Sequence, residues 1–128
     1  MHRLYDEVFN QGKTAVVDDL MAASFVDNDA VNATRDVAGL KNFVSMFRAA
    51  FPDGRFRVED MLTDGEKVVC RFSVTGTHRG DFMGMPSTGN ALNISGIDII
   101  QFANGKAIEH WGEFDGLGML RQLGPPVG

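Results

Sequence analysis

The segment NISGIDIIQFANGKAIEHWGEF, residues 93–114, decides the fold of this chain. In each half, side chains alternate with a period of two between a more apolar and a more polar set, which is typical of strands with one buried face. Asn104-Gly105 lies between the halves, and this pair favours a two-residue hairpin turn because both residue types tolerate a positive φ. We therefore predict two long antiparallel strands that are neighbours in one sheet.

Alternation also predicts which side chains of this hairpin face the interior. The apolar set comprises Leu92, Ile94, Gly96, Asp98, Ile100 and Phe102 on the first strand, and Ile108, His110, Gly112 and Phe114 on the second. An isolated charge is costly on such a face, and burial raises the pKa of a carboxyl group toward the range useful for acid/base chemistry. Asp98 is therefore a candidate catalytic group beside His110. The alternative is a structural hydrogen bond from His110 or Tyr5 inside a filled core.

Further strands are predicted before this hairpin. Residues 55–62 and 67–78 form a second hairpin across Thr63-Asp64-Gly65, and a loop over 79–90 leads to the strand that begins at residue 91. The tail, 115–126, has breakers at both ends and is expected to form one closing turn.

The first half of the chain reads mainly as helix. A short helix over 4–9 ends at Gly12, and a second is capped by Thr14 and continues through Met21. Residues 25–34 are expected to be irregular, with short strands as the alternative. The clearest helix carries Leu40, Phe43, Val44, Phe47 and Phe51 at helical spacing and stops at Pro52-Asp53-Gly54. Helices followed by antiparallel strands indicate an α+β fold, with the helices packed on one face of the sheet.

Composition bounds the class of protein. A chain of 128 residues fits a single domain, 1–128, and a net charge of −5 argues against nucleic acid as a partner. No stretch resembles a transmembrane span. The single Cys70 excludes an intramolecular disulfide or a cysteine-based zinc site and suggests a reducing, cytoplasmic setting. His2, His78 and His110 lack the spacing of metal ligands, so no metal is expected.

The run from Gly76 to Gly124 resembles the SnoaL-like polyketide cyclase (ester cyclase) family of the nuclear transport factor 2-like superfamily. The resemblance rests on the motifs GTHRG, GMPSTG, GID, EHW and QLG and extends over nearly the whole chain. It implies a cone-shaped α+β fold, in which N-terminal helices and a curved antiparallel sheet enclose a deep apolar pocket. It also implies a homodimer, and ring closure of a polyketide ester by intramolecular aldol condensation with no metal or organic cofactor.

The same resemblance assigns site residues one at a time. Asp98 matches a polar pocket position on the penultimate strand, and His110 belongs to the Glu-His-Trp motif. Family members typically carry a catalytic Asp directly after the Trp, whereas this chain has Gly112 there. Where relatives often read Val-Asp-His, the chain reads Val26-Asp27-Asn28.

Other residues are expected to shape the pocket and the subunit interface. Tyr5 and Asn28 are polar pocket candidates, and Phe43, Phe47 and Phe72 are expected in the wall. Met85, with Phe82 and Met83, is expected to cover the mouth or to enter a dimer contact, since Met adapts to irregular surfaces. Trp111 is predicted to face outward, where it would suit a subunit interface.

Three functions fit these features. The first is acid/base chemistry of the cyclase, isomerase or lyase type on a small hydrophobic carbonyl compound. A second is a non-catalytic protein that binds an apolar ligand or serves as a dimeric scaffold. The third and least favoured is epoxide hydrolysis, because Arg71 has outward parity and no second inward Asp is evident.

Overall fold

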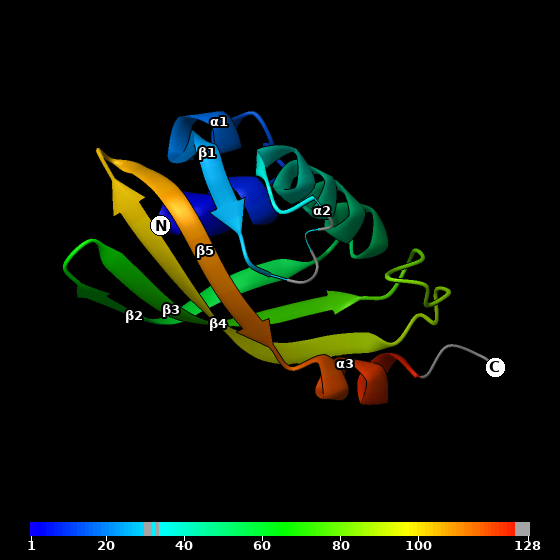
Figure 1. Cartoon of the computed structure of the whole chain (residues 1–128). Coiled ribbons are helices and arrows are strands. Elements are labelled where there is room, and N and C mark those ends of the chain that lie inside the picture. The colour runs from blue at the N-terminus through cyan, green and yellow to red at the C-terminus, as the bar shows by residue number, and fades with distance from the viewer. Residues whose placement is uncertain (30–31, 33, 125–128) are drawn as a thin grey trace.

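The structure, a computed structural model, describes residues 1–29, 32 and 34–124. Figure 1 shows the helical segments η1, α1 and α2 gathered over one face of a curved sheet, with α3 beyond the end of β5. The α+β architecture predicted from the sequence is confirmed. In chain order the elements are η1 (Leu4–Phe9, a π-helix), α1 (Val16–Leu20), β1 (Met21–Asp27), α2 (Val37–Ala50), β2 (Arg55–Asp64), β3 (Lys67–Thr77), β4 (Ala91–Ala103), β5 (Lys106–Phe114) and α3 (Gly116–Leu123).

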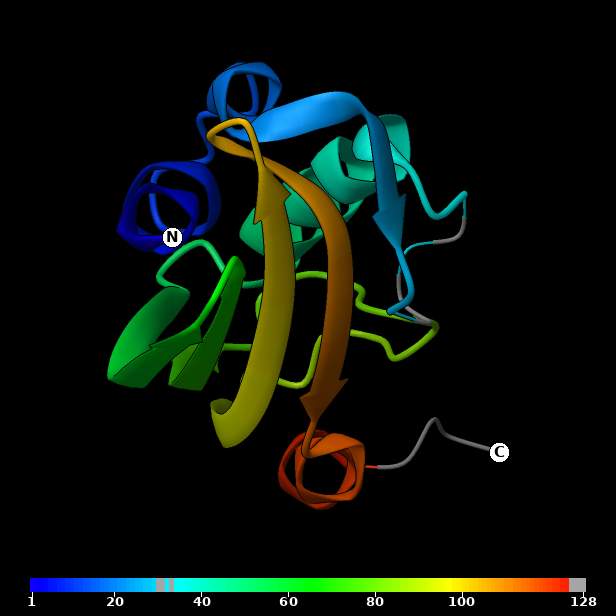
Figure 2. The same ribbon diagram turned by 60° about the vertical axis from the view of Figure 1, so that its left-hand side comes forward.

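One five-stranded sheet with the order β1-β5-β4-β3-β2 carries the fold. The pairs β2–β3, β3–β4 and β4–β5 are antiparallel, while β1 lies parallel to β5 at the edge. Figure 2 shows β4 and β5 as long, bent neighbours, with β1 starting near α1 at the top and descending beside β5. No helix within the described ranges is long and apolar enough to cross a membrane.

The parallel edge strand β1 occupies a segment that the sequence analysis divided between the end of a helix and an irregular stretch. Met21 was expected to end the second helix, but it is the first residue of β1. The N-cap of α1 is Ala15 and not the expected Thr14, and no side chain caps this helix by a hydrogen bond. Simple alternation explains the strand: Phe25 and Asp27 are buried while Val26 is 44% exposed. Of the segment predicted to be irregular, residues 30, 31 and 33 lie outside the described part, as do residues 125 and 126 of the predicted tail.

The decisive hairpin forms as predicted around Asn104 and Gly105, whose φ angles are +52° and +78°. One irregularity follows the turn, since Phe102 pairs with Ala107 whereas Gln101 pairs with Glu109. This bulge at Ile108 changes the alternation, and Ala107 is buried in place of the expected Ile108. Beyond the bulge the predicted alternation holds, which brings His110 to the inner face.

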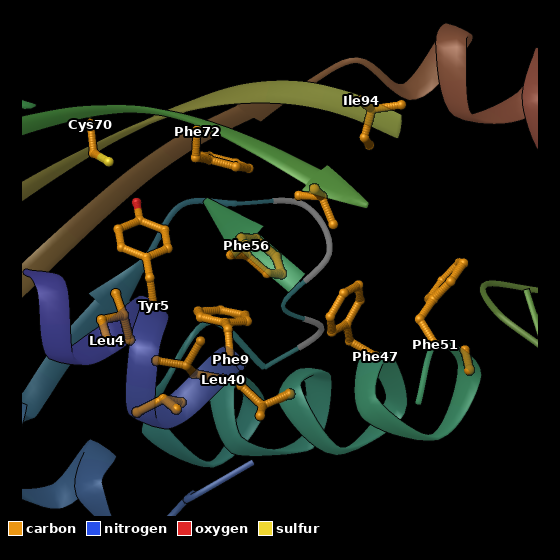
Figure 3. Close-up of a cluster of buried hydrophobic side chains, with 14 of the residues drawn as sticks. Leu4, Tyr5, Phe9, Leu40, Phe47, Phe51, Phe56, Cys70, Phe72 and Ile94 are labelled. Carbon is orange, nitrogen blue, oxygen red and sulfur yellow. The ribbon is translucent and has the colours of Figure 1, made fainter. Parts of the chain in front are cut away.

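Aromatic rings fill the space between the helices and the sheet. Figure 3 shows Phe9 from η1 and Phe47 from α2 pointing toward Phe56 and Phe72 on the strands. The ring centroid of Phe56 lies 4.6 Å from that of Phe9, 5.1 Å from that of Phe47 and 5.4 Å from that of Phe72. Each buried ring contributes roughly 2–3 kcal/mol by removal from water, so this cluster anchors the helices to the sheet.

A glycine in β4 is required by this packing. A Cβ atom on Gly96 would lie 2.4 Å from Cζ of Phe72 and 2.8 Å from the carbonyl oxygen of Glu113. We expect Gly96→Ala to lower the free energy of unfolding by about 1–3 kcal/mol, measured by urea denaturation, because the ring and the neighbouring strand must both move. Ser95→Ala, on the exposed side of the same strand, is the control and should change stability by less than about 0.5 kcal/mol. Equal stability of the two variants would contradict this reading of the packing.

Candidate active site

A cavity of about 100 Å³ lies between the helices and the inner face of the sheet. Most of its wall is apolar. The ionisable side chains of the wall come from β1, β4, β5 and the residues that follow β1: Asp27, Asp29, Asp98, His110 and the exposed Glu113. Apolar pockets with a few converging polar groups are the usual form of small-molecule sites. The cavity is therefore the candidate active site.

Asp98 and His110 meet in this cavity through the register of β4 and β5. His110 lies opposite Ile100, one pleat away from Asp98 on the same face. Its Nε2–H donates to Oδ1 of Asp98 over 2.7 Å. Each side chain is 14% exposed, so the pair is largely withdrawn from water yet reaches the cavity. The predicted proximity of the two residues is confirmed.

Tyr5 binds the second oxygen of the same carboxylate. Its hydroxyl donates to Oδ2 of Asp98 over 2.5 Å. The phenol comes from the wide turn of η1, in which the N–H of Asn10 donates to the Tyr5 carbonyl, and π-turns of this kind are frequent at functional sites. Figure 3 shows the Tyr5 hydroxyl pointing up to the sheet beside Cys70, the β3 residue that pairs with Asp98.

Asp27 holds the other nitrogen of the imidazole. Nδ1–H of His110 donates to Oδ1 of Asp27 over 2.7 Å, because β1 and β5 pair with these two residues side by side. Asn32 and the backbone N–H of Asp29 also donate to this carboxylate, over 3.1 Å and 2.9 Å. A continuous chain of hydrogen bonds thus runs from Tyr5 through Asp98 and His110 to Asp27.

These contacts set the charge of the network. Burial opposes a charged imidazole, but the hydrogen bonds and charges of Asp27 and Asp98 outweigh it and raise the pKa of His110 to about 10. Burial likewise acts to raise the pKa of Asp27, yet the hydrogen bond and charge of His110 prevail and hold that pKa below its usual value. Burial, with the Asp98 carboxylate next, raises the pKa of Tyr5 and keeps its phenol protonated. At neutral pH an imidazolium therefore lies between two carboxyl groups.

A family model described as SnoaL-like polyketide cyclase matches residues 1–123, nearly the whole chain. The chain belongs to this family. The curated relatives of this SnoaL-like chain include the aklanonic acid methyl ester cyclase DnrD of Streptomyces peucetius, 29% identical over 94% of this chain and 86% of the relative.

Solved structures agree with the family assignment. A putative polyketide cyclase from Acidithiobacillus ferrooxidans is 32% identical, with a TM-score of 0.83 over 98% of this chain and 92% of that one. TsrD from Streptomyces laurentii is 26% identical, with a TM-score of 0.84 over 91% of this chain and 87% of that one. The nuclear transport factor 2-like fold expected from the sequence is thereby shown.

The other predicted site residues of this SnoaL-like domain fall into two groups. Phe43, Phe47 and Phe72 line the cavity, together with Phe82 and Met83 from the loop before β4. Tyr5, Asn28 and Met85 are not among the lining residues. The Tyr5 hydroxyl donates a hydrogen bond to Asp98. The Asn28 amide donates to the Glu109 carboxylate and to the His110 carbonyl. Met85 is buried, and its backbone exchanges hydrogen bonds with that of Phe82.

Sequence reasoning missed three acidic residues of the wall, and one of them, Glu113, was expected on the opposite face of its strand. We expected no second inward aspartate, and this was wrong, because Asp27 and Asp29 both line the cavity. The error arose because the short strand considered within 25–34 was not assigned an inner face; the alternation of Phe25, Asp27 and Asp29 would have identified the two aspartates. None of the described residues that line the cavity is an arginine, and no group of His, Cys, Asp and Glu within the described ranges could hold a metal ion.

The charge on His110 predicts a pH dependence of stability. Its pKa is about 10 in the folded protein, above the ordinary 6.5, so its contribution is complete below about pH 6.5 and is lost as pH rises toward 10. We expect the free energy of unfolding to fall by a few kcal/mol across this window, measured by urea denaturation at intervals of pH. The ¹⁵N shifts of the His110 ring in the folded protein provide a direct check. A neutral ring at pH 8 would refute the ion pair.

Proposed function

We propose that this SnoaL-like protein catalyses acid/base chemistry on a small hydrophobic carbonyl compound, ring closure by intramolecular aldol condensation being the favoured reaction. One observation carries the proposal: Asp98 lies in the wall of an apolar cavity and accepts hydrogen bonds from both His110 and Tyr5. A purely apolar ligand would not need this arrangement, since buried charge is costly unless it is paired.

In the proposed reaction Asp98 acts as the general base. It removes a proton from the carbon next to a carbonyl group, and the electron pair of the C–H bond moves to the carbonyl oxygen to form an enolate. The enolate carbon then attacks a second carbonyl carbon in the same molecule and closes the ring, while the electron pair of that C=O bond moves to its oxygen. The resulting alkoxide takes back the proton held by Asp98, which restores the carboxylate. The imidazolium of His110 offsets the negative charge that develops in a site with little water. Asp27 keeps that imidazole charged and oriented.

The relatives suggest the class of substrate. DnrD and a second Streptomyces protein, DauD, are named aklanonic acid methyl ester cyclases. We propose a polyketide-like ester with an α-hydrogen, with the phenylalanines of the wall in contact with its apolar part. Aklanonic acid methyl ester is therefore the first substrate to test, and 2-tetralone is a simpler probe for hydrogen–deuterium exchange next to a carbonyl.

Asp98→Asn tests the assignment. The variant keeps the shape of the side chain but cannot accept the proton, so kcat for ring closure should fall by about 10²–10⁴-fold with KM little changed. Deuterium exchange into 2-tetralone, followed by NMR in D₂O, should fall in parallel. Asp64→Asn, at the exposed end of β2, is the matched control and should leave both rates unchanged.

The alternative of a binding protein predicts a different outcome. Saturable binding of the ester or of 2-tetralone, with neither ring closure nor exchange above the rate in buffer, would contradict an enzymatic role. Equal losses of affinity and turnover in Asp98→Asn would indicate that this carboxylate binds the ligand uniformly and is not a base. Epoxide hydrolysis, the third function considered, would need an arginine between two carboxylates, and no arginine is among the described residues that line the cavity.

We also propose that the protein is a cytoplasmic homodimer that associates through the outer face of the sheet. Trp111 lies on the strand face opposite His110, with the ammonium of Lys67 5.4 Å from its ring centre. Ile97, on the neighbouring strand, is 48% exposed. Sedimentation velocity should give the mass of a dimer for the wild-type protein and of a monomer for Ile97→Lys. A wild-type monomer at micromolar concentration would exclude the dimer.

A further inference from the structure

The loop between β3 and β4, residues 78–90, supplies a part of the cavity wall that belongs to no helix or strand. Phe82 and Met83 of this loop line the cavity. Of the described lining residues, only two are exposed: Met83, at 47%, and Glu113 near the end of β5. The cavity therefore reaches the surface beside this loop.

The cavity is small for the proposed substrate. Its volume is about 100 Å³, whereas sites for drug-sized ligands hold about 300–1,000 Å³. An apolar cavity of about 150 Å³ takes up a single benzene molecule. A polyketide-like ester with two reacting carbonyl groups is larger than benzene, so part of the wall must move to admit it.

Hydrogen bonds fix the two ends of the loop, which form its base. The N–H groups of Arg79 and Gly80 both donate to the Ala50 carbonyl, over 2.9 Å and 3.1 Å. On the other side the Gly89 N–H donates to the His78 carbonyl over 2.8 Å, and His78 is fully buried. Figure 1 shows the loop near the end of α2 that carries Ala50. The base is thus attached to the rigid part of the fold.

The tip of the loop, residues 81–86, is held differently. Phe82 and Met85 exchange two backbone hydrogen bonds of 2.9 Å across Met83 and Gly84. The φ angles of Met83 and Gly84, +49° and +81°, are those of a tight two-residue turn. Within the part of the chain that the structure describes, no hydrogen bond joins the tip to another segment. The tip is therefore a small hairpin that is free to move as a unit.

Apolar contact alone keeps the tip against the cavity. The side chains of Phe82 and Met85 are both buried. The ring centroid of Phe82 lies 5.2 Å from that of Phe51, 6.3 Å from that of Phe43 and 6.4 Å from that of Phe47. Such contacts are non-directional, so the apolar part of a substrate can take the place of the Phe82 ring against α2.

We propose that the tip is a gate and that Phe82 is the side chain that closes the cavity. The tip swings out about its fixed base, a hydrophobic carbonyl compound enters beside α2, and the tip then closes over it. This inference deepens the proposed function and rests on it for the kind of compound that is admitted. Loop motions of this kind set the rates of substrate binding and product release in many enzymes.

Binding of Prodan, 6-propionyl-2-dimethylaminonaphthalene, tests the gate without turnover. Prodan is a naphthyl ketone whose fluorescence changes when it enters apolar surroundings. In the wild-type protein the association rate, measured by stopped flow, should reach a plateau at high Prodan concentration, because opening of the tip then limits it. In Phe82→Ala the plateau should disappear, and the second-order rate constant should rise by tenfold or more.

Phe43→Ala is the matched comparison, because it removes a ring of the same wall from the fixed helix α2. It should change the affinity for Prodan through the dissociation rate and keep the plateau of the wild-type protein. Met46→Ala, on the exposed side of the same helix, should change neither quantity. Phe82→Leu is the milder variant if Phe82→Ala does not fold, and it should raise the plateau rate by at least threefold.

Two kinetic results would overturn the gate: a wild-type association rate that rises linearly with Prodan concentration, or an unchanged plateau in folded Phe82→Ala. Absence of Prodan binding by both proteins would overturn it too, whereas binding by Phe82→Ala alone would support a closed gate. These results do not depend on catalysis. A wild-type protein that shows the plateau but neither closes the ring nor exchanges deuterium would refute the proposed function and leave the gate in place.

Amide hydrogen exchange checks the gate in the wild-type protein. The N–H groups of Phe82 and Met85 should exchange at least tenfold faster than those of Arg79 and Gly80, because a two-residue hairpin that leaves the core is not stable alone. Saturating Prodan should slow exchange at the two tip positions by at least threefold, since the tip closes over it. Equal exchange at tip and base, or no slowing with Prodan bound, would overturn the inference.

Discussion

The site depends on one charged hydrogen bond system, His110 between Asp27 and Asp98. These three residues come from β5, β1 and β4, so the imidazolium joins the parallel edge strand to the long central hairpin. Through Asp98 the system also reaches Tyr5 and therefore η1. Removing the imidazole would leave two carboxylates without their charged donor in the wall of an apolar cavity, which is far more costly than the loss of a surface ion pair.

The hydrophobic core and the polar network place opposite demands on the same face of the sheet. Phe56 and Phe72 need an apolar interior closed by the helices, whereas Asp98 and His110 need donors and acceptors within reach. The structure meets both demands by satisfying the polar groups with one another, so the wall stays largely apolar. Because these polar side chains are largely withdrawn from bulk solvent, each electrostatic interaction among them is strengthened.

Alternation along β4 and β5 was enough to predict the hairpin, the inward face and the meeting of Asp98 with His110. It failed at Ile108, because a bulge depends on how two strands pair and not on either strand alone. Asp27 and Asp29 were missed because a strand of seven residues at the sheet edge follows directly on a helix of five, and such short elements carry little periodic signal. The contact between Asp27 and His110 required three-dimensional geometry, since the pairing of β1 with β5 joins segments that lie far apart in the sequence.

The π-helical turn of η1 has an evolutionary consequence. A turn that closes from Tyr5 to Asn10 holds one residue more than an α-helical turn, and each residue of an α-helix advances the side chains by about 100°. Deleting one residue from this turn would keep a helix but rotate Tyr5 relative to Val8 and Phe9, which are both buried in the core. The phenol could then no longer reach Asp98 while Phe9 kept its place. Insertions and deletions that are harmless elsewhere in the N-terminal region should therefore be selected against in this single turn.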